Sequence, residues 1–318
     1  MMERRDFLAG AAASVLAGGA AHALAGSEHD IPIIDTHFHL FDNRRPQGAP
    51  YTGSTDYKGG VSLPAMYRAN FAKLGVVGAI ELEASPWIED NLWVLEQLQT
   101  DPMMVGTVGD LEPEKPEFAE YLDRYRKNKL FLGIRCGNLW GRKPLAELIE
   151  NPAFIAGIRR LADADLVMDS ANPQIDLLRA VVKLNDKVPH LRIVIDHLPS
   201  FDPKPEEQAS YDAILKEMHG RPDIYAKLSE IEHRGEKARG LAAHKQQLDM
   251  FMDVFGEDRV VFGSDWPQSV GAATPAEIVS IARAYFATRS RAAAEKYFWR
   301  NSLAVYKWHK RAPNQPSL

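Results

Sequence analysis

Residues 31–39 read Ile-Pro-Ile-Ile-Asp-Thr-His-Phe-His, an apolar run that ends in a carboxylate and two imidazoles. The apolar part predicts a buried β-strand, because a strand covered on both faces reads as a nearly continuous apolar run. His37 and His39 are two residues apart. On an extended strand both side chains therefore project to the same side, where they can meet one metal ion or one substrate.

Further runs of this kind follow along the chain, separated by longer amphipathic stretches. The eight predicted strands are 31–39, 76–83, 103–111, 130–136, 165–169, 191–197, 223–229 and 259–265. Helical patterns between them include 87–100, 116–128, 152–164, 173–186 and 241–255. This alternation predicts an α/β protein with a parallel sheet, either closed as a (β/α)8 barrel or open and doubly wound. The absence of a glycine-rich phosphate-binding motif after an early strand counts against the nucleotide-binding open sheets.

Polar side chains gather where the predicted strands end. In a (β/α)8 barrel the chemistry takes place at these carboxyl ends, where side chains from several strands converge. The ionisable residues at the ends are His37, His39, Glu81, Glu83, Arg135, Asp196, His197, Lys227 and Asp265. The first and last strands of a closed barrel are neighbours, so Asp265 is expected beside His37 and His39.

Two of these residues have several candidate roles. Asp265 can act as a general base toward water or bind a divalent ion, although an Asp before Trp-Pro is also a common turn residue. His197 can bind a metal, orient a substrate carbonyl or stabilise an oxyanion, and packing alone would also explain it.

Arg135 and Lys227 are cations within apolar strands and need carboxylate partners there. For Arg135, a salt bridge with Glu83 and recognition of the substrate are equally good interpretations. Lys227, a second candidate for substrate binding, fits a structural role better, and Glu83 is either an ion-pair partner or a metal ligand. Aromatic residues just beyond strand ends could form walls for a ring-shaped substrate, namely Tyr51, Trp87, Trp140 and Trp266.

The composition restricts the partners. The formal net charge of −5 provides no broad positive field for nucleic acid or for an anionic membrane surface. The single cysteine, Cys136, cannot form an intramolecular disulfide, so any metal would be held by histidines and carboxylates. We expect a small-molecule substrate, and the sequence leaves open whether the chain forms a homo-oligomer.

Residues 1–25 follow different rules from the rest. Arg4 and Arg5 precede Asp-Phe-Leu and an Ala/Gly-rich apolar run, and Ala23-Leu24-Ala25 has the small-x-small pattern of a cleavage site. This layout predicts a twin-arginine signal peptide, which exports a folded protein, with an ordinary secretory leader as the alternative. We therefore expect cleavage near Ala25, a periplasmic single domain over 26–318, and no stable membrane insertion after the signal is removed.

Six ordered motifs together carry a family resemblance. They are Asp35-Thr36-His37-Phe38-His39, Glu89-Asp90-Asn91, Gly133-Ile134-Arg135, Val194-Ile195-Asp196-His197, Lys227-Leu228-Ser229 and Phe262-Gly263-Ser264-Asp265-Trp266-Pro267. From about Ile31 to its end, the chain resembles the amidohydrolase-related family of TIM-barrel hydrolases. Within the family, it is most similar to the branch of the sugar-acid lactonases and 2-pyrone-4,6-dicarboxylate lactonase.

The resemblance implies a hydrolase acting on ester bonds, with His37, His39 and His197 around the scissile ester and Asp265 as the base. Metal-dependent relatives have a further histidine at the end of strand five, where this chain reads Met168-Asp169-Ser170. The departure implies either no required cofactor or one weakly held divalent metal such as zinc. Its candidate ligands are His37, His39, Asp265 and Glu83.

The leading hypothesis is a hydrolase that opens a small lactone, either a sugar-acid lactone or a related carboxylated one, by attack of water. Related barrels also carry out other reactions, so a decarboxylase or a hydratase/dehydratase is the nearest alternative. A non-catalytic periplasmic protein that binds sugar acids is the alternative from another class.

Overall fold

The computed structural model describes residues 31–52, 57–232 and 239–318. Eight strands form one parallel sheet in chain order, and all residues of several of them are buried, as the apolar runs predicted. The strands are β1 (Ile33–Phe38), β4 (Val76–Leu82), β5 (Met104–Gly109), β6 (Phe131–Gly137), β7 (Val167–Ala171), β8 (Ile193–Ile195), β9 (Ile224–Leu228) and β10 (Val260–Phe262).

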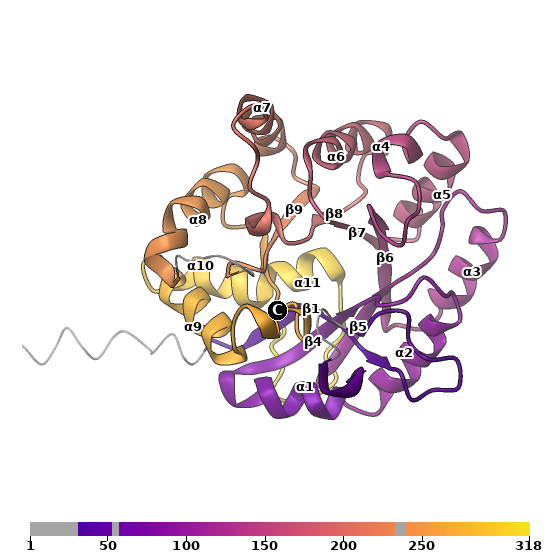
Figure 1. The fold of residues 1–318 in the computed structure, drawn as a ribbon, viewed down its shortest axis with the longest axis horizontal. Coiled ribbons are helices and arrows are strands. Elements are labelled where there is room, and N and C mark those ends of the chain that lie inside the picture. The colour runs from indigo at the N-terminus through magenta and orange to yellow at the C-terminus, as the bar shows by residue number, and fades with distance from the viewer. Residues whose placement is uncertain (1–30, 53–56, 233–238) are drawn as a thin grey trace, which may run out of the picture.

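The sheet closes between β1 and the segment that follows β10. The amide of Asp265 donates to the carbonyl of His37 at 2.8 Å, and the amide of His39 donates to the carbonyl of Trp266 at 2.9 Å. Phe38 and Trp266 form a parallel bridge there. These contacts complete an eight-stranded α/β barrel, so the predicted (β/α)8 fold is confirmed, and Figure 1 shows the strands at the centre with the helices around them.

Helices follow the strands on the outside of the barrel. They are α1 (Pro64–Phe71), α2 (Asp90–Gln99), α3 (Phe118–Tyr125), α4 (Leu145–Leu148), α5 (Pro152–Asp163), α6 (Ile175–Lys187), α7 (Gln208–His219), α8 (Leu241–Phe255), α9 (Pro275–Phe286), α10 (Arg291–Glu295) and α11 (Asn301–Tyr306). The shorter elements are the antiparallel pair β2 (Phe41–Asp42) and β3 (Val61–Ser62), the 3-10 turns η2 (Tyr57–Gly59), η3 (Ala72–Leu74), η4 (Leu198–Ser200) and η5 (Gln268–Gly271), and the π-helix η6 (Lys296–Arg300). Each of the five helices predicted from the sequence is present.

Local sequence explains where helices begin. At the start of α5 the side chain of Asn151 accepts a hydrogen bond from the amide of Ala153 at 3.0 Å, and Pro152 occupies the first turn. At the start of α9, Thr274 and Glu277 form a reciprocal capping box. These caps satisfy amides that have no partner within the helix.

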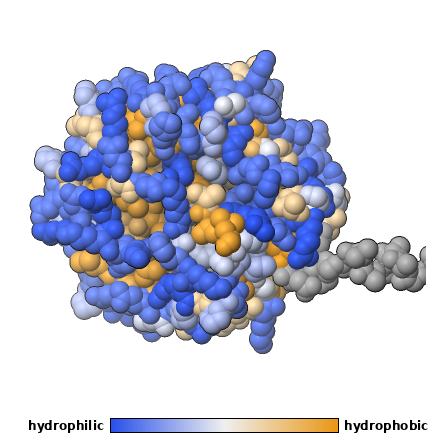
Figure 2. Space-filling view, turned by 180° about the vertical axis from the view of Figure 1, so that it is seen from behind, coloured by the Kyte–Doolittle hydropathy of each residue, from blue (hydrophilic) through white to orange (hydrophobic). Residues whose placement is uncertain are grey.

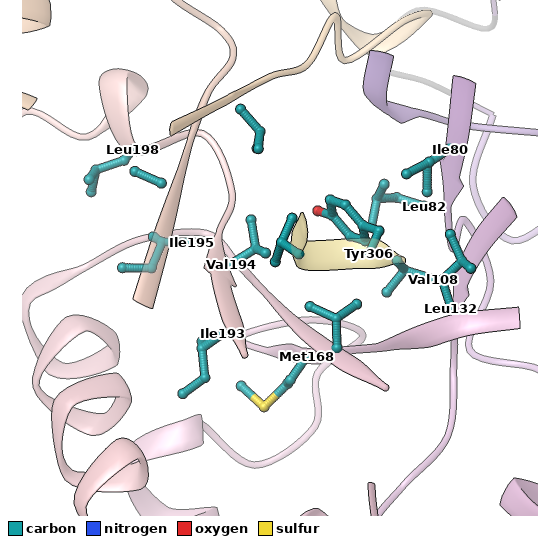
Figure 3. Close-up of a cluster of buried hydrophobic side chains, with 14 of the residues drawn as sticks. Ile80, Leu82, Val108, Leu132, Met168, Ile193, Val194, Ile195, Leu198 and Tyr306 are labelled. Atoms are coloured by element: carbon teal, nitrogen blue, oxygen red, sulfur yellow. The ribbon is translucent and has the colours of Figure 1, made fainter. Parts of the chain in front are cut away.

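The C-terminal segment covers the amino-terminal end of the barrel. Asn301 donates to the carbonyl of Val260 at the start of β10, and Gln315 donates to that of Val77 near the start of β4. Tyr306 of α11 lies among apolar side chains of the strands in Figure 3. This end is therefore packed, and the opposite end is left for chemistry.

The outer surface is mainly polar. Figure 2 shows the face opposite to that of Figure 1, where hydrophobic residues form small groups among hydrophilic ones. Within the described ranges, none of the helices combines the length and the apolar character needed to cross a membrane. The predicted signal peptide of residues 1–25 lies outside the described residues, as does the first part of the predicted domain, up to residue 30.

Candidate active site

A cavity of about 330 Å³ opens at the carboxyl ends of the strands. Its lining residues lie at the ends of seven strands of the barrel or in the loops beyond them. They are His39, Tyr51, Glu83, Ala84, Arg135, Asn138, Leu139, Trp140, Asn172, His197, Glu230, Asp265 and Gln268. The volume suits a small molecule of the size of a sugar ring.

Three imidazoles meet one carboxylate at the floor of this cavity. Asp265 Oδ1 lies 3.2 Å from His39 Nε2, 3.3 Å from His37 Nε2 and 3.6 Å from His197 Nε2. The four side chains come from β1 and from the segments directly after β1, β8 and β10, as the order of the strands predicted. His37 is completely buried behind the other three and does not itself line the cavity.

Asp35 ties together the two segments that carry this cluster. Its Oδ1 accepts hydrogen bonds from the amides of His37 and Ser264 at 3.0 and 2.9 Å, and Tyr67 donates to its Oδ2 at 2.6 Å. Gly263 permits the close approach, since a Cβ at this position would lie 2.9 Å from the Cβ of His37. Burial raises the pKa of Asp35 to about 6 in spite of these hydrogen bonds.

Backbone conformation marks the same region. Nine non-glycine residues in the described chain have positive φ, and five of them line the cavity: Trp140, Asn172, His197, Glu230 and Asp265. The left-handed conformation is unfavourable for residues with a Cβ and recurs at functional sites, where the surrounding structure maintains it. Here it turns side chains toward the cavity directly after the strands end.

Burial favours the neutral form of two of the histidines, and a contact orients the third. Burial lowers the pKa of His37 well below its ordinary value and lowers that of His197 to about 4. His39 Nδ1 lies 2.8 Å from the carbonyl oxygen of Leu82 and must donate to it. This contact leaves Nε2 as the ring nitrogen of His39 that faces Asp265, at 3.2 Å.

A buried ion network lies beneath the histidines. Lys227 is fully buried, with Nζ 2.7 Å from Asp169 Oδ2, 2.8 Å from Asp196 Oδ1 and 3.3 Å from His37 Nδ1. It does not line the cavity. Lys227 therefore does not bind substrate as one of the predictions had it, because its ammonium is enclosed by the two carboxylates and the imidazole.

Arg135 pairs with carboxylates and also lines the cavity, so its role in substrate recognition stays a prediction. Its Nε donates to Asp196 at 2.9 Å, and its guanidinium lies 3.6 Å from Glu83, yet the side chain also lines the cavity. Glu83 in turn accepts a hydrogen bond from Trp140 Nε1 at 3.0 Å. Burial, more than the opposing charge of Arg135, sets the pKa of Glu83, which is raised to about 8.

The four aromatic candidates separate into two groups. Tyr51 and Trp140 line the cavity, with ring centroids 6.4 Å apart in an edge-to-face arrangement. Trp87 lines a separate small pocket. Trp266 is buried and packs against Tyr67 of α1, because its backbone pairs with β1 and its ring lies on the helical side. The prediction that Trp87 and Trp266 form walls of this cavity is therefore wrong, since neither side chain lines it.

The sequence did not single out several polar lining residues. Glu230 lies one residue beyond the motif that ends strand β9. Looking for polar residues just after strand ends, which identified His197 and Asp265, could therefore have identified it too. Asn172 was missed because β7 extends to Ala171, two residues beyond its predicted end. Asn138 directly follows β6, and Gln268 accepts a hydrogen bond from Tyr51 at 2.6 Å.

The donor set fits a divalent metal ion. His37 Nε2, His39 Nε2 and Asp265 Oδ1 lie 3.2–3.3 Å from one another. Tetrahedral ligands at bond lengths of about 2.0–2.2 Å lie about 3.3–3.6 Å apart, so the spacing suits one ion such as zinc. His197, Glu230 and Asp265 form a second set of three. Glu83 belongs to neither set. Its Oε2 accepts the hydrogen bond of Trp140, and its Oε1 lies 3.6 Å from Arg135, so its role as a metal ligand stays a prediction.

Fold and site together define a barrel enzyme with a histidine–aspartate centre. The chain belongs to the amidohydrolase family, whose model matches residues 34–308. It is 27% identical over 289 residues to an L-fucono-1,5-lactonase from Burkholderia multivorans, an alignment that covers 85% of this chain and 94% of that protein. The predicted resemblance to the lactonase branch of the family is confirmed, and the protein is an enzyme of the hydrolase class.

Solved structures support the fold. An amidohydrolase from Burkholderia multivorans with bound zinc superposes with a TM-score of 0.76 at 24% identity, covering 87% of this chain and 100% of that one. A 5-carboxyvanillate decarboxylase from Novosphingobium aromaticivorans, complexed with manganese, has a TM-score of 0.65 at 16% identity, covering 89% and 97%. The same barrel thus occurs in proteins named for different reactions.

Proposed function

We propose that this protein hydrolyses the ester bond of an uncharged, polyhydroxylated lactone, with Asp265 as the general base. The observation that carries the proposal is the environment of the Asp265 carboxylate. Its Oδ1 faces three imidazole nitrogens, while its buried Oδ2 makes no hydrogen bond to any described residue. An unoccupied carboxylate oxygen beside a cavity can accept a proton from water.

The reaction follows from the groups around this carboxylate. Asp265 takes a proton from water as the water oxygen attacks the lactone carbonyl. His197 and Arg135 are the donors available to the carbonyl oxygen as it gains negative charge. The ring C–O bond then breaks, and the proton held by Asp265 passes to the departing ring oxygen, which gives a hydroxy acid. A divalent metal held by His37, His39 and Asp265 would polarise the carbonyl or the water.

The charges around the cavity favour an uncharged substrate. Arg135 is the one lysine or arginine among the described lining residues, and Asp196 already pairs with it. Glu83, Glu230 and Asp265 are the carboxyl groups of the lining. A dicarboxylate would need further cations to replace its hydration, so we favour a sugar-acid lactone over a carboxylated one.

Polar and aromatic residues suit the hydroxyl groups and the ring of such a lactone. Asn138, Asn172 and Gln268 offer amides to hydroxyl groups, and Tyr51 and Trp140 form an apolar corner. The relative named L-fucono-1,5-lactonase supports this substrate class, because a fucono-1,5-lactone is an uncharged cyclic polyol ester.

A panel of lactones tests the proposal. Purified protein is mixed with 1,4- and 1,5-aldonolactones and with 2-pyrone-4,6-dicarboxylate, and acid release is followed with a pH indicator before and after chelation. We expect turnover of an aldonolactone, and for Asp265→Asn a kcat lower by about 10²–10⁴-fold. Asp176→Asn, at a largely exposed position, is the matched control with normal turnover. Near-normal turnover by Asp265→Asn would refute the general base.

The panel also separates the alternatives. Binding of an aldonolactone without acid release would indicate a binding protein. Inactivity on every lactone, together with CO₂ release from an aromatic carboxylic acid, would indicate a decarboxylase.

We further propose that residues 1–25 direct export of the folded protein to the periplasm. The support is the sequence pattern of Arg4-Arg5 before an Ala/Gly-rich apolar run. Replacing both arginines with lysine should retain the protein in the cytoplasm, as measured by cell fractionation. Unchanged periplasmic recovery would favour an ordinary secretory leader.

A further inference from the structure

Lys227 contacts His37 on the side of the imidazole ring that faces away from Asp265. Its Nζ lies 3.3 Å from His37 Nδ1, and two carboxylates, Asp169 and Asp196, fill the rest of its immediate surroundings. The ring of Tyr306 lies 5.7 Å away, and its hydroxyl donates to Asp169 at 2.8 Å. This close-packed environment holds the ammonium in one place.

The contact between Lys227 and His37 specifies where the proton lies on the imidazole. An ammonium group can only donate hydrogen bonds, so His37 Nδ1 must accept with its lone pair. The other neighbour of Nδ1, Asp196 Oδ1, is at 3.6 Å, which is too far for a hydrogen bond. Neutral His37 therefore carries its proton on Nε2, the atom that faces Asp265 and His39.

His37 and His39 thus differ in what they offer to a metal. His39 donates from Nδ1 to the carbonyl of Leu82 and keeps a lone pair on Nε2, the usual arrangement of a metal-binding histidine. His37 has the opposite tautomer and presents an N–H at the same point. To bind an ion it would have to move its proton to Nδ1, against the donors of Lys227.

We propose that Lys227 is a positioning residue that holds His37 as the Nε2–H tautomer and thereby weakens divalent metal binding by His37, His39 and Asp265. The positive charge of the ammonium acts in the same direction, because it repels a second cation. In the metal-free site the Nε2–H of His37 points at Asp265 Oδ1, 3.3 Å away, and leaves Oδ2 for water. This last role rests on the proposed function, whereas the tautomer and the metal affinity do not depend on the substrate.

Nuclear magnetic resonance of the wild-type protein tests the tautomer directly. In metal-free protein with ¹⁵N-labelled histidine, the ring pattern of His37 should show a proton on Nε2 and that of His39 a proton on Nδ1. Spectra of His37→Gln and His39→Gln assign the two signals. A His37 signal with its proton on Nδ1 would overturn the proposal, and this measurement requires no change at Lys227.

Zinc affinity tests the consequence. Lys227→Met alone would leave Asp169 and Asp196 without their shared cation, so we combine it with Asp169→Asn, which keeps an acceptor for Tyr306. Zinc binding, measured by competition with a chromophoric chelator at fixed pH, should tighten by about 10- to 100-fold, the range typical of partners of metal-binding histidines.

Asp169→Asn alone retains Lys227 and is the matched control, for which we expect no tightening. Circular dichroism checks that both variants fold. Equal zinc affinity of the double variant and the wild type would refute the proposal, as would a single variant that binds zinc as tightly as the double variant.

Discussion

Replacing Asp196 with Asn tests the ion network under the active site. Asp196 lies 2.9 Å from Arg135 Nε and 2.8 Å from Lys227 Nζ, and all three side chains are buried. Asn retains the size and one acceptor but not the charge. Removing one partner of a buried pair costs about 3–5 kcal/mol. In this variant Lys227 still pairs with Asp169, and Arg135 still lies near Glu83. We therefore expect the free energy of unfolding to fall by an amount near the lower end of this range, about 3 kcal/mol.

Urea unfolding measures this loss. With a slope of about 3 kcal/mol per M, a loss of about 3 kcal/mol moves the midpoint by about 1 M. Asp176→Asn is the control, because Asp176 is 82% exposed and pairs only loosely with Arg179, at 3.6 Å. If Asp196→Asn and Asp176→Asn unfold at the same urea concentration at pH 7, the network does not stabilise the fold and the reasoning fails.

The pH dependence gives a second check on the same variant. Burial alone would raise the pKa of Asp196, but Lys227 and Arg135 outweigh burial and hold it well below the ordinary value. A carboxyl group with a lowered pKa contributes stability above its unfolded value, near 4, and loses it as the pH falls through the folded value. The difference between wild type and Asp196→Asn should therefore be complete at pH 7 and narrow below about pH 4. A difference that stays constant at acid pH would contradict this assignment.

Two further variants probe other parts of the site. Burial raises the pKa of Glu81 to about 8, so its neutral form stabilises the fold fully only below the unfolded pKa, near 4, and this contribution is lost between about pH 4 and pH 8. Glu81→Gln should therefore melt near the wild-type temperature at pH 4 and above it at pH 9. A difference in melting temperature that is the same at both pH values would contradict this. Tyr51→Ala removes an aromatic wall and the hydrogen bond to Gln268, and should raise KM about tenfold with a smaller effect on kcat. Tyr51→Phe keeps the ring, so its KM should lie between those of the wild type and Tyr51→Ala. An unchanged KM in Tyr51→Ala would show that this ring does not contact the substrate.

The sequence was sufficient to predict the barrel and the convergence of its central residues. Apolar runs locate buried strands, and in a barrel the order of the strands determines which ends are neighbours. Asp265 could therefore be expected beside His37 and His39, although more than 220 residues separate them. This inference needs only the position of each residue at a strand end.

The direction of a side chain beyond a strand could not be predicted in the same way. The two-residue period applies to extended backbone, whereas His197, Glu230 and Asp265 have φ between 51° and 54°. Trp266 was therefore expected in the cavity wall, and its ring lies against α1 instead. For Lys227 the sequence showed a cation in a strand, but its two carboxylate partners come from β7 and from the position directly after β8, and only the fold determines the register of these strands.

The left-handed residues and the ion network are energetically connected. A left-handed conformation costs about 1–2 kcal/mol for a residue with a Cβ, so His197, Glu230 and Asp265 together cost about 3–6 kcal/mol. The cost expected for removing Asp196 is of the same order. Asp196 precedes His197 in the chain, and its partner Lys227 lies three residues before Glu230, so the ion pair joins two of the strained segments. The ion pair thus holds the two segments together where the strain arises, and Asp196→Asn should misplace His197 before it unfolds the barrel.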